Sequence, residues 1–349
     1  MTTYRVAIVG LGRKGSTIDD ENRWLTNYDR NPCSHASAYV ANERTQIIAV
    51  ADPSPAKLAA FSARYGECAT YNDYRAMLAR ERPELVSVCT HAPLHAKVTV
   101  AAAAAGAKGV LVEKAMAVSL AECDAMLAAC EQVGAKLLVN HPRRFHATFR
   151  AAKLLLDSGE LGPLQVIIAS GYNKFAHNGS HAFDMLRYFA GEATAVQGEL
   201  VEREDPEDFD GRAVVRMQSG VTGFVDFASS QPFAFQIWCP EGRITIDQFS
   251  EGFAVSRFVP ENPDETGPWF RYRPKREVVE RLVPSPEWPM QNAVDELVAA
   301  VDGNREPASH GLDGRAALEL IVAAHESAAQ GGAWIAVPVV ASARVVRSR

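Results

Sequence analysis

The chain has few cysteines, and none of them are arranged as a metal or redox motif. The six cysteines of its 349 residues include no Cys-x-x-Cys, and they lie at Cys33, Cys68, Cys89, Cys123, Cys130 and Cys239. Scattered single cysteines argue against a disulfide framework and against a zinc ribbon. We therefore expect reduced thiols in a cytoplasmic enzyme.

Long apolar segments are also missing. The longest alanine-rich run, Val98 to Ala105, is far shorter than the roughly 20 residues that a membrane-spanning helix needs. The first residues, Met1 to Val9, lead directly into a strand pattern without the charged and apolar regions of a signal peptide. We expect no membrane partner.

The chain has no excess of basic residues, since its formal net charge is −6. A nucleic-acid partner is therefore not expected, because phosphate binding requires a basic face. Hydrophobic residues make up 47% and charged residues 22%, which is ordinary for a globular protein. A small molecule is the expected partner, and the length predicts two domains.

The first 142 residues alternate apolar strands with helical segments. The predicted strands are Arg5–Val9, Gln46–Ala51, Leu85–Cys89, Gly109–Val112 and Lys136–Val139. The predicted helices include Pro55–Tyr65, His95–Ala105 and Leu120–Val133. Continuous Val, Ile and Leu strands separated by helices indicate a parallel sheet covered on both faces. The fold class is α/β, with a Rossmann domain over residues 1–142.

Residues 143–349 follow a different pattern, which predicts an α+β domain. Helices are expected over His146–Ser158, near His181–Phe189, and over Met290–Asp302 and Leu312–Gln330. The predicted strands are Leu164–Ala169, Ala195–Val201, Ala213–Gln218, Thr222–Ala228, Phe233–Cys239, Arg243–Asp247 and Ala254–Phe258. Their hairpin spacing indicates a large, mostly antiparallel open sheet. Glu261–Pro289 is expected to be irregular loop and edge strand.

A glycine-rich turn follows the first strand and predicts a dinucleotide site. Its glycines are Gly10, Gly12 and Gly15, and Asp52 closes the second strand. Such a turn lets a pyrophosphate approach the backbone, while the acidic residue accepts hydrogen bonds from the ribose hydroxyls. Asp52 would repel a 2′-phosphate, so NAD is favoured. The cations Arg13, Lys14 and Lys57 could partly offset this repulsion, so NADP is not excluded as the cofactor.

The spacing within this motif is long. Asp52 lies 37 positions after Gly15, whereas about twenty are usual. We attribute the difference to an insertion over Ser16–Cys33, which carries Asp19, Asp20, Glu21, Trp24, Tyr28 and Arg30. The insertion is either a surface loop or a flap over the pyrophosphate or substrate.

Lys114 follows Glu113 at the end of an apolar strand. Ligands of open α/β sheets bind at the carboxyl ends of the strands, so this amine is expected near a nicotinamide ring. The alternative is a solvated lysine paired with Glu113. Three further motifs are expected to face the same cleft, and they run over Thr90–His95, Asn140–Phe145 and His177–Arg187.

Taken together, these motifs resemble the Gfo/Idh/MocA family of oxidoreductases, named for glucose-fructose oxidoreductase and inositol dehydrogenase. The matching segments are Val9–Gly12, Val50–Pro53, Thr90–His95, Val112–Lys114, Arg143–Phe145, Gly179–Asp184, Gly311–Leu318 and His325–Ser327. The resemblance implies hydride transfer between nicotinamide and a hydroxyl-bearing carbon of a sugar, sugar derivative or cyclitol. It also implies a homodimer or homotetramer formed through the open sheet.

The resemblance further implies catalytic roles. His181 matches the family's catalytic histidine, which takes the hydroxyl proton, and Lys114 matches a lysine that stabilises the developing alkoxide. Glu113 would hold Lys114. Two positions depart from the family pattern. Ala115 replaces a proline, so a cis peptide is not expected there, and His177 replaces an aspartate, which predicts a variant acid/base arrangement.

Other residues complete the predicted site. Thr90, Pro93 and His95 are expected beside the nicotinamide, although a plain helix start is the alternative. Arg144 is expected to reach substrate or to form an interdomain salt bridge. Asp184 lines the site or pairs with Arg187. The predicted substrate contacts are Lys114, Arg144, Tyr172, Asn173, Lys174, His177, His181 and Asp184.

Two histidines and Asp184 also suggest a metal site, but the family pattern explains Asp184 better, and no metal is expected. Two other functions remain open. One is a redox-assisted glycosidase that keeps NAD tightly bound. The other is a non-catalytic sensor that binds dinucleotide, for which Lys114 and His181 would be dispensable.

Overall fold

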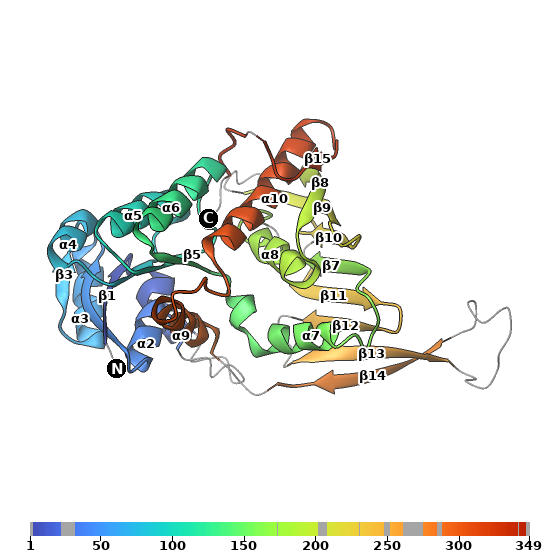
Figure 1. The fold of residues 1–349 in the computed structure, drawn as a ribbon, viewed down its shortest axis with the longest axis horizontal. Helices are drawn as coiled ribbons and strands as arrows, with labels where there is room; N and C mark the ends of the chain where they lie inside the picture. Colours follow the sequence, from blue (N-terminus) through green and yellow to red (C-terminus); the bar gives the residue numbers. More distant parts are fainter. Residues whose placement is uncertain are drawn as a thin grey trace. The chain divides into compact units, whose positions relative to one another are not determined.

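The computed structural model describes residues 3–21, 32–172, 174–201, 208–229, 231–247, 252–260, 275–284, 288–340 and 342–346 (Figure 1). The chain forms two compact units. The first contains residues 1–146, 287–322 and 341–349, and the second contains residues 147–286 and 323–340. Each unit is described by itself.

A six-stranded parallel sheet forms the centre of the first unit. Its strands are β1 (Tyr4–Val9), β2 (Thr45–Ala51), β3 (Ala69–Tyr71), β4 (Leu85–Val88), β5 (Gly109–Glu113) and β6 (Lys136–Asn140), in the order β3-β2-β1-β4-β5-β6. This is the dinucleotide-binding order, in which the strand sequence reverses between β1 and β4. The predicted Rossmann fold is confirmed. The short strand β3 was not predicted.

The helices of this unit begin and end at clear signals. They are η1 (Arg13–Thr17), α1 (Ile18–Glu21), α2 (His35–Ala41), α3 (Pro55–Tyr65), α4 (Tyr74–Glu81), α5 (Ala92–Ala104), α6 (Leu120–Val133) and η3 (Pro142–Phe145). Ser54 and Ser119 cap α3 and α6 by accepting hydrogen bonds from backbone N–H groups. The bounds of these two helices agree with the prediction.

Helix α9 (Pro289–Asp302) belongs to the first unit, although the sequence prediction placed it in the second domain. Its apolar stripe, which includes Met290, Val294 and Leu297, is buried in the same core cluster as the strands. The Tyr4 hydroxyl donates to Asp302 at 2.6 Å. An amphipathic stripe shows that a helix is buried, but not which sheet it covers.

The second unit contains a nine-stranded mixed sheet, mostly antiparallel, as predicted. Its order is β14-β13-β12-β11-β7-β10-β9-β8-β15, and β7 and β10 are its parallel pair. The strands are β7 (Val166–Ser170), β8 (Ala193–Val201), β9 (Asp210–Met217), β10 (Thr222–Asp226), β11 (Ala234–Cys239), β12 (Gly242–Asp247), β13 (Phe253–Pro260), β14 (Lys275–Leu282) and β15 (Ile335–Ala336).

Helices cover one face of this sheet. They are α7 (Ala147–Asp157), α8 (Gly179–Ala190) and the part of α10 (Gly311–Ala329) that belongs to this unit. A Cβ at Gly223 would lie 2.2 Å from Leu186 of α8, and one at Gly198 would lie 2.5 Å from the Ala324 carbonyl oxygen of α10. Glycine is therefore required where these helices approach most closely. Among the described residues, no helix is long and apolar enough to cross a membrane.

Candidate functional site

The glycine turn of the first unit lies against the end of β4. Gly10 has a φ of +91°, and a Cβ there would lie 2.8 Å from the main chain of Cys89. A Cβ at Gly15 would lie 2.1 Å from the Gly10 carbonyl oxygen. The side of Gly12 is open, because a Cβ there would have no neighbour within 4 Å among the described residues. A turn this tight, with one open glycine, fits the close approach of a pyrophosphate.

Asp52 closes β2 and is buried beside this turn. Its carboxylate accepts hydrogen bonds from the backbone N–H of Leu11 at 2.9 Å and from that of Ser54 at 3.0 Å. The Lys57 ammonium lies 3.5 Å from the same carboxylate. Asp52 thus fixes the shape of the glycine turn, and Lys57 is the cation nearest to it among the three predicted.

The other two predicted cations, Arg13 and Lys14, act on different groups. Arg13 forms an exposed ion pair with Glu21 at 2.6 Å. The charge of Lys14 acts on the Glu113 carboxyl and on the Cys89 thiol, at the ends of β5 and β4. Lys14 therefore lies near enough to the ends of β4 and β5 for its charge to act on both groups.

The described ends of the Ser16–Cys33 insertion are tied together. The buried Asp19 carboxylate accepts from the backbone N–H of Cys33 at 2.7 Å and from that of Ser34 at 3.2 Å. Arg64 pairs with Asp20 at 2.5 Å. Trp24, Tyr28 and Arg30 lie outside the described residues, so the choice between loop and flap stays open.

Glu113, the last residue of β5, is buried in a polar network. The His35 Nε2 lies 3.1 Å from its Oε1, and the Asn140 side chain donates to the same oxygen at 2.8 Å. Burial raises the pKa of Glu113, but hydrogen bonds from His35 and Asn140 and the charge of Lys14 outweigh it, so the pKa lies well below its usual range. Glu113 is held as a carboxylate.

Lys114 follows directly and is partly buried. Its peptide bond to Ala115 is cis, so the prediction that replacing proline would prevent a cis bond was wrong. The intrinsic preference for trans belongs to an isolated peptide, and the packing around Ala115, which is 5% exposed, overrides it here.

Thr90, Pro93 and His95 were predicted to lie beside the nicotinamide, and His95 contacts the segment that follows Lys114. His95 is 1% exposed, and its ring nitrogens each lie 2.9 Å from a main-chain oxygen, that of Ala115 and that of Thr90. Burial lowers the pKa of His95, although the hydrogen bonds to Thr90 and Ala115 oppose it. Pro93 lies in the first turn of α5. His95 links the loops that follow β4 and β5.

Arg144 forms its ion pair inside the first unit. Its guanidinium donates to the Asp313 carboxylate and to the Ala308 carbonyl oxygen, both at 3.0 Å. Its side chain is 8% exposed and that of Asp313 is 9% exposed. Both residues belong to the first unit. This ion pair is therefore not the predicted interdomain salt bridge.

In the second unit, His177 and His181 lie at the start of α8. His177 occupies the turn before the helix, and His181 lies in its first turn with its ring 6.2 Å from that of Phe233, edge to face. The Ser180 hydroxyl donates to the His177 carbonyl oxygen at 2.8 Å. The two histidines are thus close in the chain, and both are partly buried.

A carboxylate that the sequence reasoning missed holds this turn. Asp208 accepts hydrogen bonds from the backbone N–H of Ala176 at 3.0 Å and from that of His177 at 2.8 Å. Burial raises the pKa of Asp208, against the effect of these hydrogen bonds. Asp208 lies in an acidic stretch between two strands, and nothing in that stretch distinguishes it from its neighbours.

The remaining predicted substrate residues also lie in the second unit. Tyr172 is 42% exposed after β7. Lys174 has a φ of +62°, and its backbone N–H donates to Asp210 at 3.3 Å. Asp184 is 1% exposed in α8, and Arg187 pairs with Glu192 at 2.5 Å. Asn173 lies outside the described residues.

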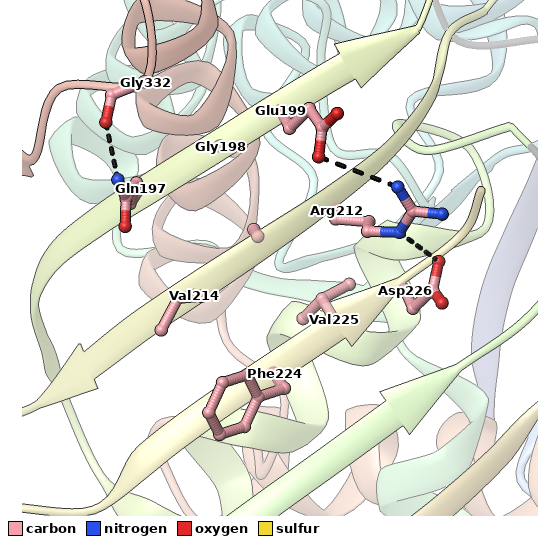
Figure 2. Close-up of a pocket in the computed structure, with 10 residues that line it drawn as sticks. Gln197, Gly198, Glu199, Arg212, Val214, Phe224, Val225, Asp226 and Gly332 are labelled. Carbon is pink, nitrogen blue, oxygen red and sulfur yellow. Dashed lines mark hydrogen bonds and ion pairs between the residues drawn. The ribbon is translucent and has the colours of Figure 1, made fainter. Parts of the chain in front are cut away.

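A separate hollow of about 370 Å³ lies on the sheet of the second unit, over β8, β9 and β10 (Figure 2). In Figure 2, Arg212 lies between Glu199 and Asp226, which are 3.6 and 3.4 Å away. Phe224, on the neighbouring strand, is 41% exposed. Because Phe224 alternates with Gly223, this face is opposite to the one that α8 covers.

Comparisons with known proteins agree with the architecture. Residues 4–141 match the family described as "Oxidoreductase family, NAD-binding Rossmann fold". Inositol 2-dehydrogenase from Rhizobium meliloti is 26% identical over 94% of this chain and 98% of its own length. A second relative is 1-carboxy-3-chloro-3,4-dihydroxycyclo hexa-1,5-diene dehydrogenase from Comamonas testosteroni. It is 32% identical to this chain over a match that covers 42% of this chain and 37% of that protein.

Among solved structures, aldose-aldose oxidoreductase from Caulobacter crescentus complexed with glycerol superimposes with a TM-score of 0.77. It is 24% identical, and the match covers 96% of this chain and 100% of that one. At this identity the likeness establishes the fold. The site residues must be argued from their own geometry.

Proposed function

We propose that the chain oxidises a hydroxyl-bearing carbon of a sugar, sugar derivative or cyclitol, or reduces the corresponding ketone, because residues 4–141 match the Gfo/Idh/MocA family of NAD-binding oxidoreductases. The observation that carries this proposal is Lys114 directly after the carboxyl end of β5, in the sheet whose strand β1 leads into a glycine turn shaped for a dinucleotide. The full-length similarity to an inositol 2-dehydrogenase supports the substrate class.

The cofactor fits residues of the first unit. Gly10, Gly12 and Gly15 would hold the pyrophosphate, and the buried Asp52 carboxylate would accept from the ribose hydroxyls. Thr90 and Pro93 would border the ring, and the Lys14 charge would act near the same strand ends. When bound, the nicotinamide accepts or supplies the hydride.

Lys114 and His181 would serve the reacting hydroxyl. The Lys114 ammonium would stabilise the negative charge that develops on the hydroxyl oxygen. The His181 imidazole would accept the proton, because its ordinary pKa lies near the operating pH. His177, next to it in the turn held by Asp208, would donate to a neighbouring hydroxyl of the substrate. Tyr172, Lys174, Asp184 and Arg144 are proposed as further contributors to substrate specificity.

A panel of cyclitols, aldoses, sugar acids and glycosides, assayed for NADH fluorescence and for release of the aglycone, tests the activity. Lys114→Met and His181→Ala are expected to lower kcat/KM by at least about a hundredfold. Binding of NADH by the His181→Ala variant should be unchanged, which serves as the control. Activity that persists in both variants would contradict the catalytic assignment, and release of an aglycone without NADH accumulation would favour the glycosidase instead.

We also propose that the open face of the second unit's sheet joins two copies of the chain. The face carries the half-buried Trp238 and the exposed Phe224, with charged residues at the rim of the hollow in Figure 2. Apolar side chains of this kind on a sheet face are typical of interfaces. Phe224→Glu is expected to convert the oligomer to monomer in light scattering, while Val133→Glu, at an exposed position on α6, should leave it intact.

A further inference from the structure

Two buried histidines contact the residues on either side of Lys114. His35, on α2, contacts the side chain of Glu113, and His95, on α5, contacts the carbonyl oxygen of Ala115. The relative exposures of these histidines are 0% and 1%. Neither ring therefore faces solvent, and the two rings approach the same short segment of chain from different helices.

The His35 ring is fixed at both of its nitrogens. Nε2 lies 3.1 Å from Glu113 Oε1, and Nδ1 lies 2.9 Å from the Ser87 hydroxyl. The Ser87 hydroxyl also lies 3.0 Å from the Tyr39 hydroxyl. With both nitrogens engaged, the ring cannot turn without losing a buried hydrogen bond. Glu113 is therefore held at a fixed place at the end of β5.

The His95 ring spans two loops. One nitrogen contacts the Thr90 carbonyl oxygen after β4, and the other contacts the Ala115 carbonyl oxygen after β5. The distance is 2.9 Å in each case. Both oxygens only accept, so the neutral ring donates to one of them and contacts the other, and it lies between the segment that follows β4 and the peptide that follows Lys114.

We propose that His35 and His95 are positioning residues, which fix the backbone of Lys114 from both sides and so place its ammonium for the reaction. The proposal rests on the function proposed above, in which Lys114 stabilises charge on the reacting oxygen. A lysine side chain has a flexible four-carbon stem. The position of its ammonium is therefore defined only if the backbone that carries it is fixed. A displacement of about 1 Å in a reacting group can lower the rate by roughly a hundredfold.

Matched amides separate positioning from ordinary packing. The amide nitrogen of asparagine occupies about the place of Nδ1, and that of glutamine about the place of Nε2. His35→Gln keeps the contact with Glu113, and His35→Asn keeps only the contact with Ser87. For His95 the order reverses, because Asn keeps the contact with Ala115 and Gln keeps only the contact with Thr90.

The expected result is therefore a crossed pattern in kcat. His35→Gln should exceed His35→Asn, and His95→Asn should exceed His95→Gln, in each case by about tenfold to a hundredfold. The dissociation constant for NADH should stay within about twofold in the two His35 variants, because neither the glycine turn nor the Thr90 segment is altered. Equal kcat within each pair, or the same preferred amide at both positions, would overturn the proposal.

A second measurement does not depend on turnover. Acetylation of Lys114 by acetic anhydride, followed by mass spectrometry with NADH bound, reports the surroundings of its amine. The rate should change in His35→Asn and His95→Gln and stay near the wild-type rate in the other two variants. If no substrate in the panel reduces NAD, the proposed function fails, yet this pattern still supports positioning, and equal rates in all four variants overturn it.

Folding is checked first, because both histidines are buried. Thermal unfolding of each variant shows whether the four chains are folded at the assay temperature. If the His35 variants are not folded, the His95 pair decides alone. Its two contacts are to main-chain oxygens of separate loops, so a preference for Gln over Asn there would contradict the proposal.

Discussion

The predicted site residues lie in two regions that are built in different ways. In the first unit, the glycine turn, Asp52 and Lys114 sit at the ends of parallel strands and are held by buried hydrogen bonds. In the second unit, His177 and His181 lie at a turn whose backbone donates to Asp208 and Asp210, which come from another part of the chain. The first region is a property of the Rossmann sheet, whereas the second relies on contacts with a separate segment.

The largest expected effect is in the glycine turn. Gly15→Ala places a Cβ 2.1 Å from a main-chain oxygen, so the turn must open. We expect NADH binding to fall by more than about a hundredfold and the free energy of unfolding to drop by about 2–4 kcal/mol. Isothermal calorimetry and urea unfolding measure these. Gly12→Ala, with open space around its Cβ, should change the free energy of unfolding by less than about 0.5 kcal/mol.

The second prediction concerns Asp208 in the other region. Asp208→Ala leaves the buried backbone N–H of Ala176 and the partly buried one of His177 without their acceptor, and a buried donor left unpaired costs about 1–3 kcal/mol. We expect kcat to fall at least tenfold while NADH binding is unchanged. Asp208→Asn, which keeps one acceptor oxygen, should lie between the alanine variant and the wild type. Unchanged kcat in Asp208→Ala would show that the turn is held by other contacts.

The third prediction is that acid affects the two units with opposite sign. The pKa of His95 is lowered by burial, so below about pH 6.5 the unfolded chain binds more protons than the folded one, and the first unit loses stability. The depressed pKa of Glu113 adds to this loss below about pH 4.3.

Asp208 behaves in the opposite way. Its pKa is raised by burial, so its contribution to stability is present below about pH 3.9 and is lost as the pH rises through its folded value. Hydrogen exchange between pH 7 and 5, resolved by peptide, should show protection falling in β4 and β5 before it falls around Ala176. The reverse order would contradict these assignments.

The smallest expected effect is at Arg13. Its ion pair with Glu21 is exposed, and exposed pairs contribute little to stability. Arg13→Gln should leave the unfolding midpoint unchanged and should lower NADH affinity by no more than about threefold. A larger loss of affinity would place Arg13 on the cofactor and would favour the flap interpretation of the insertion.

The same contrast explains what could be predicted from sequence. The glycine turn, Asp52 and the Glu113-Lys114 pair lie within local patterns that directly follow strands, so their positions could be anticipated. Asp208 and His35 act through contacts between distant segments, 31 positions from His177 and 78 from Glu113. No local pattern carries that information. The cis bond at Ala115 was missed for the same reason, because tertiary packing and not residue type determines it.

The path of the chain between the units has a consequence for synthesis on the ribosome. The chain leaves the first unit at residue 146 and returns at residue 287, so all six strands of the parallel sheet emerge long before α9. Until residue 302 is made, the surface that α9 buries stays uncovered while residues 147–286 of the second unit are translated. The first unit therefore receives α9, and the later residues that also belong to it, only after the second unit's residues 147–286 have been made. A ribosome that stalls within those residues holds a first unit with part of its core open.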